Sequence, residues 1–328
     1  MQAMGKLALI SEETVRKIVT RQLAFDAVRA AFEAVAVHRS RVFDVVIGTG
    51  LHNGEAFAIK SGIDIENEMV GFKCGTYWAG NFDKDQPAHG STILLLDPET
   101  GFPKALVNAS YLNGYRTAAA NAIAVSNLAR AEAAVLGVIG AGLQAEQEIR
   151  AVAEVRAFSQ IKISTRSEAR ASWIADRLQD VDIDIRFTSA EDAVRGSDVV
   201  ITVTPSELPL VRDEWIKEGT HISAMGADDK GKHELDTAIL KRSSLFADYP
   251  QQSIIIGEFQ HAYDDGLINS ADDICPLGLV TLGKSPGRIS DSQITVFDSS
   301  GIAIQDLMVA GAIFEAAQKM SQVQYIDF

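Results

Sequence analysis

The sequence is poor in cysteine, in positive charge and in long apolar runs. Two cysteines, Cys74 and Cys275, are too few for a disulfide framework or a zinc knuckle, and they fit ordinary thiols in a reducing cytosol. Lys and Arg number 30 against 44 Asp and Glu, and this net charge of −14 argues against a nucleic-acid or anionic-membrane partner. No run of about 18 apolar residues is present, as a membrane-spanning helix would require.

Length and composition indicate a globular protein of two domains. At 328 residues the chain is long for a single hydrophobic core. A hydrophobic content of 47% and a charged content of 23% are typical of globular proteins. The opening segment MQAMGKLALISEE is too short and too soon acidic for a secretory signal. We therefore expect a cytoplasmic protein that binds neither nucleic acid nor membrane and whose site contains no metal.

The first third of the sequence has the mixed pattern of an α+β domain. Thr20 suits the N-cap of a helix, because apolar residues recur at helical spacing from Leu23 to Val35. A second helix is predicted over Thr117–Leu128, which places Arg116 at its start. A turn sequence, DPETGFP, separates the last two of several short strands. These predicted strands are Val42–Ile47, Ala56–Ile59, Val70–Phe72, Thr92–Leu96 and Lys104–Asn108.

Strands and helices alternate from about residue 135 onward. Such alternation is typical of a doubly wound parallel sheet, so the expected fold class is α/β with a Rossmann-type domain. The final helix is predicted over Ile302–Gln318, with one broad apolar face. The predicted strands are Val135–Ile139, Ile161–Ser164, Asp198–Thr204, His221–Met225 and Ser244–Ala247, and the first two helices between them are Gln144–Val155 and Glu168–Leu178.

The sequence GAGLQA carries the most specific motif. It follows an apolar strand and opens a helix, which is the context of a dinucleotide-binding fingerprint. Gly140 permits the tight turn, Gly142 lets a pyrophosphate approach the backbone, and Ala145 lets the helix pack closely. The free N–H groups of the first helical turn, which contains Leu143 and Gln144, would face the phosphates. The motif predicts a site for NAD(H) or NADP(H).

The end of the next predicted strand bears on the choice between these two cofactors. An acid at that point would bind the adenosine ribose, but the sequence is Thr165-Arg166-Ser167. Arg166 suits a 2′-phosphate and so favours NADP(H). Alternatively, Arg166 stacks on the adenine or lies in solvent, and Thr165 binds an unphosphorylated ribose.

Three further segments contain candidate substrate-binding side chains. Lys73 lies on a short predicted strand before a loop rich in glycine and aromatic residues, and it is either an anion ligand or a surface lysine. Arg116 begins a helix of small apolar residues, where a guanidinium opposes the helix dipole unless it holds a carboxylate. The loop Met225–Leu235, which contains Asp228, follows a predicted strand of the parallel sheet, and such loops face the cofactor.

At these residues the sequence resembles the ornithine cyclodeaminase/mu-crystallin family. The matching segments occur in family order and cover nearly the whole chain. They are Gly71–Lys73, His89–Gly101, Arg116–Ala119, Val138–Ala145, Gly226–Asp228, Gly231–Leu235 and Phe297–Asp306.

The resemblance implies a domain arrangement. Residues 1–118 and 303–328 would form a discontinuous substrate-binding and dimerisation domain, and residues 119–302 would form the Rossmann dinucleotide-binding domain. Two such chains would pair in a homodimer.

The resemblance also implies roles for individual residues. Lys73 and Arg116 would bind the substrate carboxylate beside the nicotinamide, and Asp228 would handle the substrate nitrogen. Other residues would line the cofactor or close over the nicotinamide and its substrate: Thr204, Asp228, Ser299 and Gly301.

The sequence departs from the family at the position of one cationic residue. Many members carry another carboxylate-binding arginine in the early strand, and here it is missing near Val46 or Ile47. Lys60 stands instead where many members have an apolar residue, and it would suit a substrate with a second carboxylate unless it is a solvated strand residue. The sequence KSG at 60–62, taken with Gly75–Asn81, is similar to the iminosuccinate reductases of the family.

The chemistry implied is hydride exchange at the α-carbon of an amino acid, between a C–H/amine and a C=N group. We predict an enzyme of amino-acid metabolism, an NAD(P)H-dependent reductase of a 2-imino acid to an L-amino acid, such as iminosuccinate to L-aspartate. Lys73 or Asp228 would supply the proton, and His89 is either a further candidate or a structural histidine. One alternative is an ornithine cyclodeaminase that forms proline and ammonia with catalytic NAD+, and another is a non-catalytic, crystallin-like binding protein.

Overall fold

The computed structural model describes residues 6–84 and 86–328, which divide into two compact units. Unit 1 combines the N-terminal segment up to Arg116 with the C-terminal segment Ile302–Phe328. Unit 2 comprises Thr117–Gly301. Each unit contains its own sheet. Substrate binding and dimerisation by the first domain, and dinucleotide binding by the second, remain predictions.

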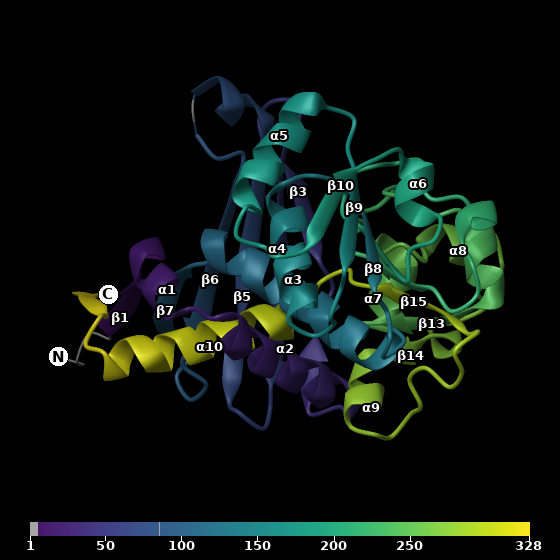
Figure 1. Ribbon diagram of the computed structural model, residues 1–328. Helices are drawn as coiled ribbons and strands as arrows, with labels where there is room; N and C mark the ends of the chain where they lie inside the picture. Colours follow the sequence, from purple (N-terminus) through teal and green to yellow (C-terminus); the bar gives the residue numbers. More distant parts are fainter. Residues whose placement is uncertain (1–5, 85) are drawn as a thin grey trace. The chain divides into compact units, whose positions relative to one another are not determined.

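Unit 1 is built on a mixed sheet of eight strands. The strands are β1 (Lys6–Ile10), β2 (Ser40–Val42), β3 (Val46–Thr49), β4 (Glu55–Asp64), β5 (Met69–Trp78), β6 (His89–Leu96), β7 (Pro103–Asn108) and β16 (Gln324–Asp327). Their order is β16-β1-β7-β6-β5-β4-β2, and β3 pairs with β4. β1 and β7 are parallel, whereas the other neighbouring pairs are antiparallel. The first and last strands, purple and yellow in Figure 1, lie side by side.

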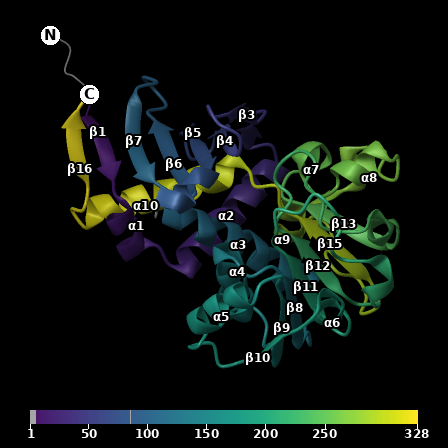
Figure 2. The same ribbon diagram turned by 90° about the horizontal axis from the view of Figure 1, so that it is seen from above.

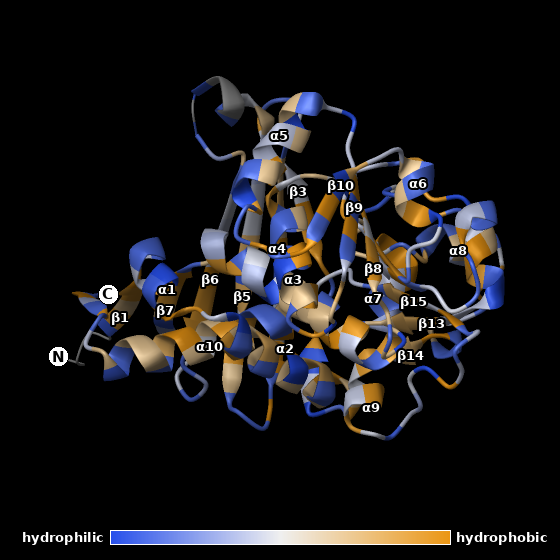
Figure 3. Ribbon diagram, in the orientation of Figure 1, coloured by the Kyte–Doolittle hydropathy of each residue, from blue (hydrophilic) through white to orange (hydrophobic). Residues whose placement is uncertain are grey.

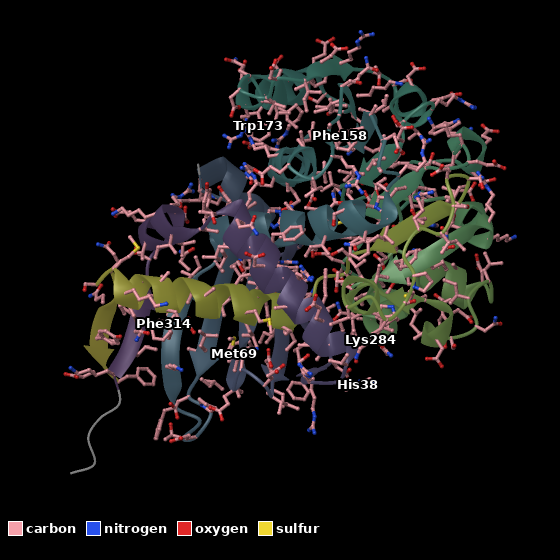
Figure 4. All side chains as sticks on the ribbon, turned by 60° about the horizontal axis from the view of Figure 1, so that its bottom comes forward. His38, Met69, Phe158, Trp173, Lys284 and Phe314 are labelled. Carbon is pink, nitrogen blue, oxygen red and sulfur yellow. The ribbon has the colours of Figure 1, made fainter. Side chains whose placement is uncertain are left out.

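One face of this sheet is covered by two long helices. α2 (Arg21–Ala36) begins where the sequence predicts, because the Thr20 side chain accepts a hydrogen bond from Leu23 N at 3.1 Å. α10 (Ala303–Lys319) is almost entirely buried at its N-terminal end and crosses the strands beside α2 (Figure 2). Figure 4 shows the side chains of Met69 and Phe314 beside this helix. The other helices of unit 1 are α1 (Glu12–Ile18), the 3-10 helix η1 (Ala79–Lys84) and the first part of α3 (Ser110–Leu128).

Three strand predictions for unit 1 are wrong in extent. The segments predicted as short strands at 56–59 and 70–72 are parts of the ten-residue strands β4 and β5. Gly75–Trp78 continues β5 and is not a loop, and the segment 42–47 belongs to two strands, β2 and β3. Glycines and charged residues interrupt the apolar alternation here, but pairing with neighbours on both sides satisfies the backbone of β5 and overrides local propensity.

Unit 2 contains an eight-stranded parallel sheet, which confirms the predicted Rossmann-type α/β class. The strands are β8 (Val135–Ile139), β9 (Gln160–Ser164), β10 (Asp184–Phe187), β11 (Val199–Thr202), β12 (His221–Ala224), β13 (Ser243–Ala247), β14 (Cys275–Pro276) and β15 (Ile294–Asp298). Their order is β10-β9-β8-β11-β12-β15-β13-β14, and every pair is parallel. The strands β10, β14 and β15 were not predicted from the sequence. β11, β12 and β15 are fully buried, and Figure 3 shows hydrophobic residues along β8.

The strand order of unit 2 reverses at its first strand. The chain proceeds from β8 to β9 and β10 on one side, and β11 and β12 lie on the other. The loops after β8 and β11 are therefore neighbours at the carboxyl edge, which is where parallel α/β sheets bind ligands. The helices of unit 2 are the second part of α3, then α4 (Leu143–Ala153), α5 (Glu168–Arg177), α6 (Ala190–Val194), η2 (Asp213–Trp215), η3 (Thr237–Arg242), α7 (Pro250–Ile256), α8 (Gln260–Asp264), η4 (Ala271–Asp273) and α9 (Leu277–Thr281).

Two negative findings apply to the described ranges, 6–84 and 86–328. None of their helices combines the length and the apolar character needed to cross a bilayer. Nowhere in those ranges do three or more His, Cys, Asp or Glu side chains gather as a metal site would require.

Candidate active site

Three cationic side chains are buried together in unit 1. Lys60 on β4 and Lys73 on β5 are directly opposite each other in the antiparallel register, so both side chains point to the same face of the sheet. On that face, Lys73 Nζ lies 2.8 Å from Asp306 Oδ2 on α10. Arg116 Nε, from α3, lies 3.1 Å from the other oxygen of Asp306. Lys60, Lys73 and Arg116 are only 7%, 6% and 8% exposed, so neither lysine is a solvated surface residue.

Two neutral side chains complete this group, which we call the cation cluster. Asn113 Oδ1, one turn before Arg116, accepts hydrogen bonds from Arg116 Nη2 at 2.9 Å and from Lys73 Nζ at 3.4 Å. Gln305 Oε1 accepts from Arg116 Nη1 at 3.5 Å. The charges of Lys73, Arg116 and Lys60 all act on the carboxylate of Asp306. Three cationic side chains therefore act on one buried carboxylate.

Burial and charge tune the titration of the cation cluster. Burial, reinforced by the positive charge of Arg116, lowers the pKa of Lys73 to about 7, although Asp306 opposes the shift. Burial alone would raise the pKa of Asp306, but the charges of Lys73 and Arg116 outweigh it and lower that pKa. Asp306 therefore stays ionised at neutral pH while Lys73 exchanges its proton there. A group that titrates near the working pH is suited to proton transfer.

The predicted position of Arg116 at a helix N-terminus is wrong. α3 begins at Ser110, and Arg116 lies in its second turn. The start of α3 is tied to β6, because Ser91 N donates to Ser110 Oγ at 3.1 Å. Asn113 and Gly114 weaken the helical pattern in the sequence, which explains why the prediction began too late. The helix-dipole argument for Arg116 thus fails, and its ion pair with Asp306 accounts for its burial.

Sequence reasoning did not single out Asp306 or Asn113. The available signal was an acid in α10 that is followed by the apolar run LMVAGAIF. An ionised side chain on a buried helix requires a partner, because an unpaired buried charge is strongly unfavourable. The sequence pattern indicates the need for that partner without identifying it.

The turn after β8 fits a dinucleotide pyrophosphate. Gly140 has a φ of +126°, which favours glycine, and a Cβ at this position would lie 2.7 Å from the carbonyl oxygen of Val203. Gly142 is the N-cap of α4 and adds no side-chain cap, and no described atom lies within 4 Å of the Cβ position that it leaves open. Ala145 is fully buried against the sheet, as the motif predicts. The uncapped N–H groups at this helix N-terminus are suited to phosphate oxygens.

Four other predicted cofactor residues lie near this turn or beyond the next strand. Leu143 is 66% exposed, and Gln144 Nε2 donates to Glu148 Oε1 at 2.6 Å along its own helix. Thr165 and Arg166 follow β9 at the same edge of the sheet, where Arg166 is exposed and Thr165 is half-buried. These placements fit both of the roles predicted for the adenosine end.

Thr204 and Asp228 follow β11 and β12 but differ in environment. Thr204 N and Oγ1 each lie 2.7 Å from Glu234 Oε1, to which both donate. Asp228 is an exposed carboxylate that forms an ion pair with Lys232 Nζ at 2.5 Å. Asp228 is therefore a solvated acid, unlike the buried Lys73.

Ser299 and Gly301 follow β15 and are anchored by a buried acid. The carboxylate of Asp248 accepts from Gly301 N at 2.7 Å and from Ser299 Oγ at 3.3 Å. Gln252 Nε2 donates to the carbonyl oxygen of Gly301 at 2.9 Å. Asp248 was not identified from the sequence, because it precedes the segment it anchors by about 50 residues and carries no motif.

His89 begins β6 with an exposed side chain. Its ring centroid lies 4.7 Å from that of Tyr77, the opposite residue on β5. A surface contact between aromatic rings supports the structural interpretation of this histidine.

Comparison with known proteins identifies the family. Residues 8–321 match the ornithine cyclodeaminase/mu-crystallin family. The chain belongs to this family. The iminosuccinate reductase of Paracoccus denitrificans is 36% identical over 321 residues, which cover 98% of this chain and all of that protein. The alanine dehydrogenase of Archaeoglobus fulgidus is 36% identical over 324 residues, 98% of each chain.

Solved structures from this family have the same fold over nearly the whole chain. The P. denitrificans iminosuccinate reductase in complex with NAD+ has a TM-score of 0.90 at 35% identity, covering 99% of this chain and 100% of that one. An archaeal alanine dehydrogenase dimer with bound NAD has a TM-score of 0.92 at 34% identity, with the same coverage. The Thermococcus litoralis Δ1-pyrroline-2-carboxylate reductase in complex with NADH and L-proline has a TM-score of 0.91 at 27% identity, covering 97% and 100%. The ornithine cyclodeaminase/mu-crystallin family thus includes NAD(P)-dependent oxidoreductases that act on imine and amine bonds.

Proposed function

We propose that this chain is an NAD(P)H-dependent reductase that converts a 2-imino acid to an L-amino acid, with iminosuccinate to L-aspartate as the preferred reaction. The observation that carries the proposal is the burial of Lys60, Lys73 and Arg116 around the carboxylate of Asp306. A buried group of three cationic side chains favours a strongly anionic ligand. The two carboxylates of iminosuccinate would bind to such a group better than the one carboxylate of a simple imino acid.

The cation cluster would orient the substrate. A nicotinamide dinucleotide bound at the GAGLQA turn would supply the hydride. Arg116 carries a planar guanidinium that can bind the α-carboxylate through two parallel hydrogen bonds. Lys73 would share the α-carboxylate with Arg116, and Lys60 would hold the second carboxylate. Fixing both ends of a small acid orients its α-carbon, and such alignment can lower the barrier by several kcal/mol.

Lys73 is the stronger candidate for the proton donor. Reduction of C=N adds a hydride to carbon and a proton to nitrogen, so an acid is needed beside the nitrogen. Lys73 is buried with a pKa of about 7, and it therefore carries a transferable proton at neutral pH. Asp228 is exposed and already forms an ion pair with Lys232, so it lacks the buried setting that tunes Lys73.

Replacing Lys60 with methionine tests the choice of substrate. Methionine keeps much of the length of lysine without its charge. We expect the KM for the four-carbon imino diacid to rise about tenfold or more, because a charge-assisted hydrogen bond is lost. Imines of pyruvate and glyoxylate, which have one carboxylate, should keep their KM. The measurement is loss of absorbance at 340 nm with oxaloacetate, pyruvate or glyoxylate plus ammonia, run with NADH and with NADPH.

Lys17→Met is the matched control for this substitution. Lys17 is an exposed residue of α1 in the same unit, paired with Glu13, and its loss should leave every substrate unaffected. Equal losses on all substrates in Lys60→Met would contradict a role in binding the second carboxylate.

The choice of coenzyme is tested at Arg166. The ratio of the Michaelis constants for NADPH and NADH, compared between the wild type and an Arg166→Ala variant, tests whether Arg166 binds a 2′-phosphate.

The same group of buried cations disfavours the cyclodeaminase alternative. Ornithine carries a second ammonium group, which would add to the positive charge of the cation cluster. Ammonia release from ornithine without net change in the cofactor would nevertheless support that activity. Coenzyme affinity without turnover of any imine would support the crystallin-like alternative.

We also propose that unit 1 pairs in a homodimer through the sheet face opposite α10. In the antiparallel register that face carries a band of apolar side chains: Val46, Ile59, Phe72, Leu94 and Leu106. Val46 is 57% exposed and Leu106 is 36% exposed. A partly exposed band of apolar side chains on a sheet is typical of an interface, and a second copy of the same face would cover it.

Replacing Leu106 with aspartate tests this dimer. The charge would be buried without a partner in the dimer but solvated in the monomer, so we expect the variant to be monomeric. Light scattering coupled to size-exclusion chromatography gives the mass directly. Leu208→Asp is the control, because Leu208 is 73% exposed and belongs to unit 2. A dimeric Leu106→Asp variant, or a monomeric wild type, would contradict the proposed interface.

A further inference from the structure

A buried acid joins the ends of two neighbouring strands in unit 2. Glu234 is fully buried, and its carboxylate accepts four hydrogen bonds. Thr202 Oγ1 donates at 2.8 Å, Thr204 N and Oγ1 each at 2.7 Å, and Gly226 N at 2.9 Å. Thr202 ends β11 and Thr204 follows it, and Gly226 follows β12. A single side chain therefore holds two adjacent loops at the carboxyl edge of the sheet.

The two loops pack closely against this acid at Gly226. A Cβ at Gly226 would lie 2.2 Å from the carbonyl oxygen of Thr204 and 2.7 Å from Glu234 Cδ. The two loops and the carboxylate are thus in direct contact, and only glycine fits between them. Movement of Glu234 would have to displace both loops together.

Glu234 is in turn held by a second buried acid. Glu258 accepts from Glu234 N at 3.0 Å with each carboxylate oxygen, and from Leu235 N at 2.7 Å. Burial raises the pKa of both glutamates, and for Glu258 the charge of Glu234 adds to the effect. Burying two acids so close together is unfavourable, and their backbone and hydroxyl donors compensate for it. The outcome is one well-defined position for the Glu234 carboxylate.

The two loops lie on the nicotinamide side of the fingerprint turn. The pyrophosphate turn follows β8, and the adenosine side is marked by β9 and β10. β11 and β12 continue in the opposite direction, so their loops extend toward the other half of a bound dinucleotide. The loop after β12 also leads to Asp228, whose backbone follows Gly226 by two residues.

We propose that Glu234 is a positioning residue for the coenzyme, because it fixes Thr204 and the Gly226–Asp228 loop in the geometry that receives the nicotinamide half. The inference rests on the proposed function in that it requires a dinucleotide at this edge. Glu234 itself does not contact the coenzyme, since all of its carboxylate is enclosed by protein donors. Its contribution is to keep both loops preorganised, so that binding does not have to order them.

Glu234→Gln is the informative substitution. The amide has the same shape but turns one acceptor into a donor. That donor faces one hydroxyl, which can turn to accept, and one backbone N–H, of Thr204 or Gly226, whose hydrogen bond is lost. We expect the dissociation constant of NAD(P)H, measured by fluorescence titration without substrate, to rise about tenfold. Thr202→Val removes only one donor at constant volume and should raise the constant by a smaller factor. This milder variant preserves the test if Glu234→Gln does not fold.

Asp198→Asn provides a matched control at the opposite end of β11. Asp198 is also a buried acid, and it accepts from Ala134 N at 2.9 Å and from Val135 N at 3.0 Å while pairing with Arg130 and Lys217. Its loss should also lower the melting temperature. Asp198 lies at the amino edge of the sheet, opposite the edge proposed to bind the coenzyme. The affinity of Asp198→Asn for the coenzyme should therefore remain that of the wild type. A merely structural role for Glu234 would make the two variants behave alike.

The outcomes separate this inference from the proposed function. Weakened coenzyme binding in Glu234→Gln and Thr202→Val, with wild-type binding in Asp198→Asn, supports the inference. Wild-type affinity in both loop variants, or equal weakening in Asp198→Asn, overturns it. Coenzyme binding by the unaltered chain without turnover of any imine removes the reductase proposal and leaves the inference standing. Failure of the unaltered chain to bind either coenzyme overturns both.

Discussion

Replacing Lys73 with methionine is expected to lower kcat for every imino acid by about 100-fold or more, the usual scale for losing a positioned proton donor. Lys73 is buried beside Asp306 and titrates at about 7, so the variant loses both a proton and a charge from the cation cluster. Coenzyme affinity should not change, because the GAGLQA turn belongs to unit 2. Steady-state assays at 340 nm and fluorescence titration of the coenzyme measure the two quantities separately.

The pH dependence of the rate distinguishes proton donation by Lys73 from a purely electrostatic role. Reduction requires the protonated form of the Lys73 side chain, so kcat/KM should fall as the pH rises through about 7. The negative charge of a bound substrate raises the pKa of Lys73, and the corresponding fall in kcat should occur at higher pH. Lys73→Arg keeps the charge over this whole range and should lose the fall near 7 together with most of the activity. An unchanged pH profile in Lys73→Arg would assign the proton to another group, and Asp228→Asn would then be the next variant to test.

Replacing Arg116 with methionine is expected to raise the KM for all carboxylate substrates by about 10- to 100-fold, the loss of one bidentate charged contact. The substitution also removes Arg116 as a partner of the buried Asp306, which keeps its ion pair with Lys73. Removing one member of a buried ion pair costs about 3–5 kcal/mol, so the melting temperature should fall as well. Steady-state kinetics over several imino acids, with differential scanning fluorimetry, measure both effects.

A second variant separates binding by Arg116 from protein stability. Arg116→Lys keeps the charge but not the planar fork, and its KM should lie between those of the wild type and Arg116→Met. Arg29→Met is the control, since Arg29 is an exposed residue of α2 paired with Glu33. If KM is unchanged in both Arg116 variants, Arg116 does not bind the substrate, whatever their stability.

The dinucleotide turn was predictable because its determinants are local. The strand before it, the glycine at +126° and the small Ala145 all act within a few residues, and each is visible in the sequence. The alternation of strands and helices in unit 2 was predictable for the same reason. The strands β10, β14 and β15 are exceptions. The buried run ITVFD of β15 lies after a long irregular segment and was not recognised as a strand.

The cation cluster was predictable only in part. The sequence pointed to Lys73 and Arg116 as unusual cations, but it left Lys60 open between a ligand and a surface residue. The glycine- and aromatic-rich segment after Lys73 was mistaken for a loop because its strand character depends on pairing with β4 and β6. The start of α3 was placed too late, so Arg116 was given a reason for its position that the structure does not support.

The sequence by itself determined the class of sheet in unit 2, the place of the fingerprint turn and the chemical types available for the site. Backbone sterics and hydrophobic periodicity act over short stretches of chain, so one sequence is sufficient to read them. Only the tertiary structure decided that Lys60 faces Lys73, that Asp306 reaches both Lys73 and Arg116, and that Glu234 joins two loops. Strand register and helix packing bring these groups together from distant segments, and the burial that results shifts their pKa values. Charge and burial at a site are properties of that assembly, and no local segment encodes them.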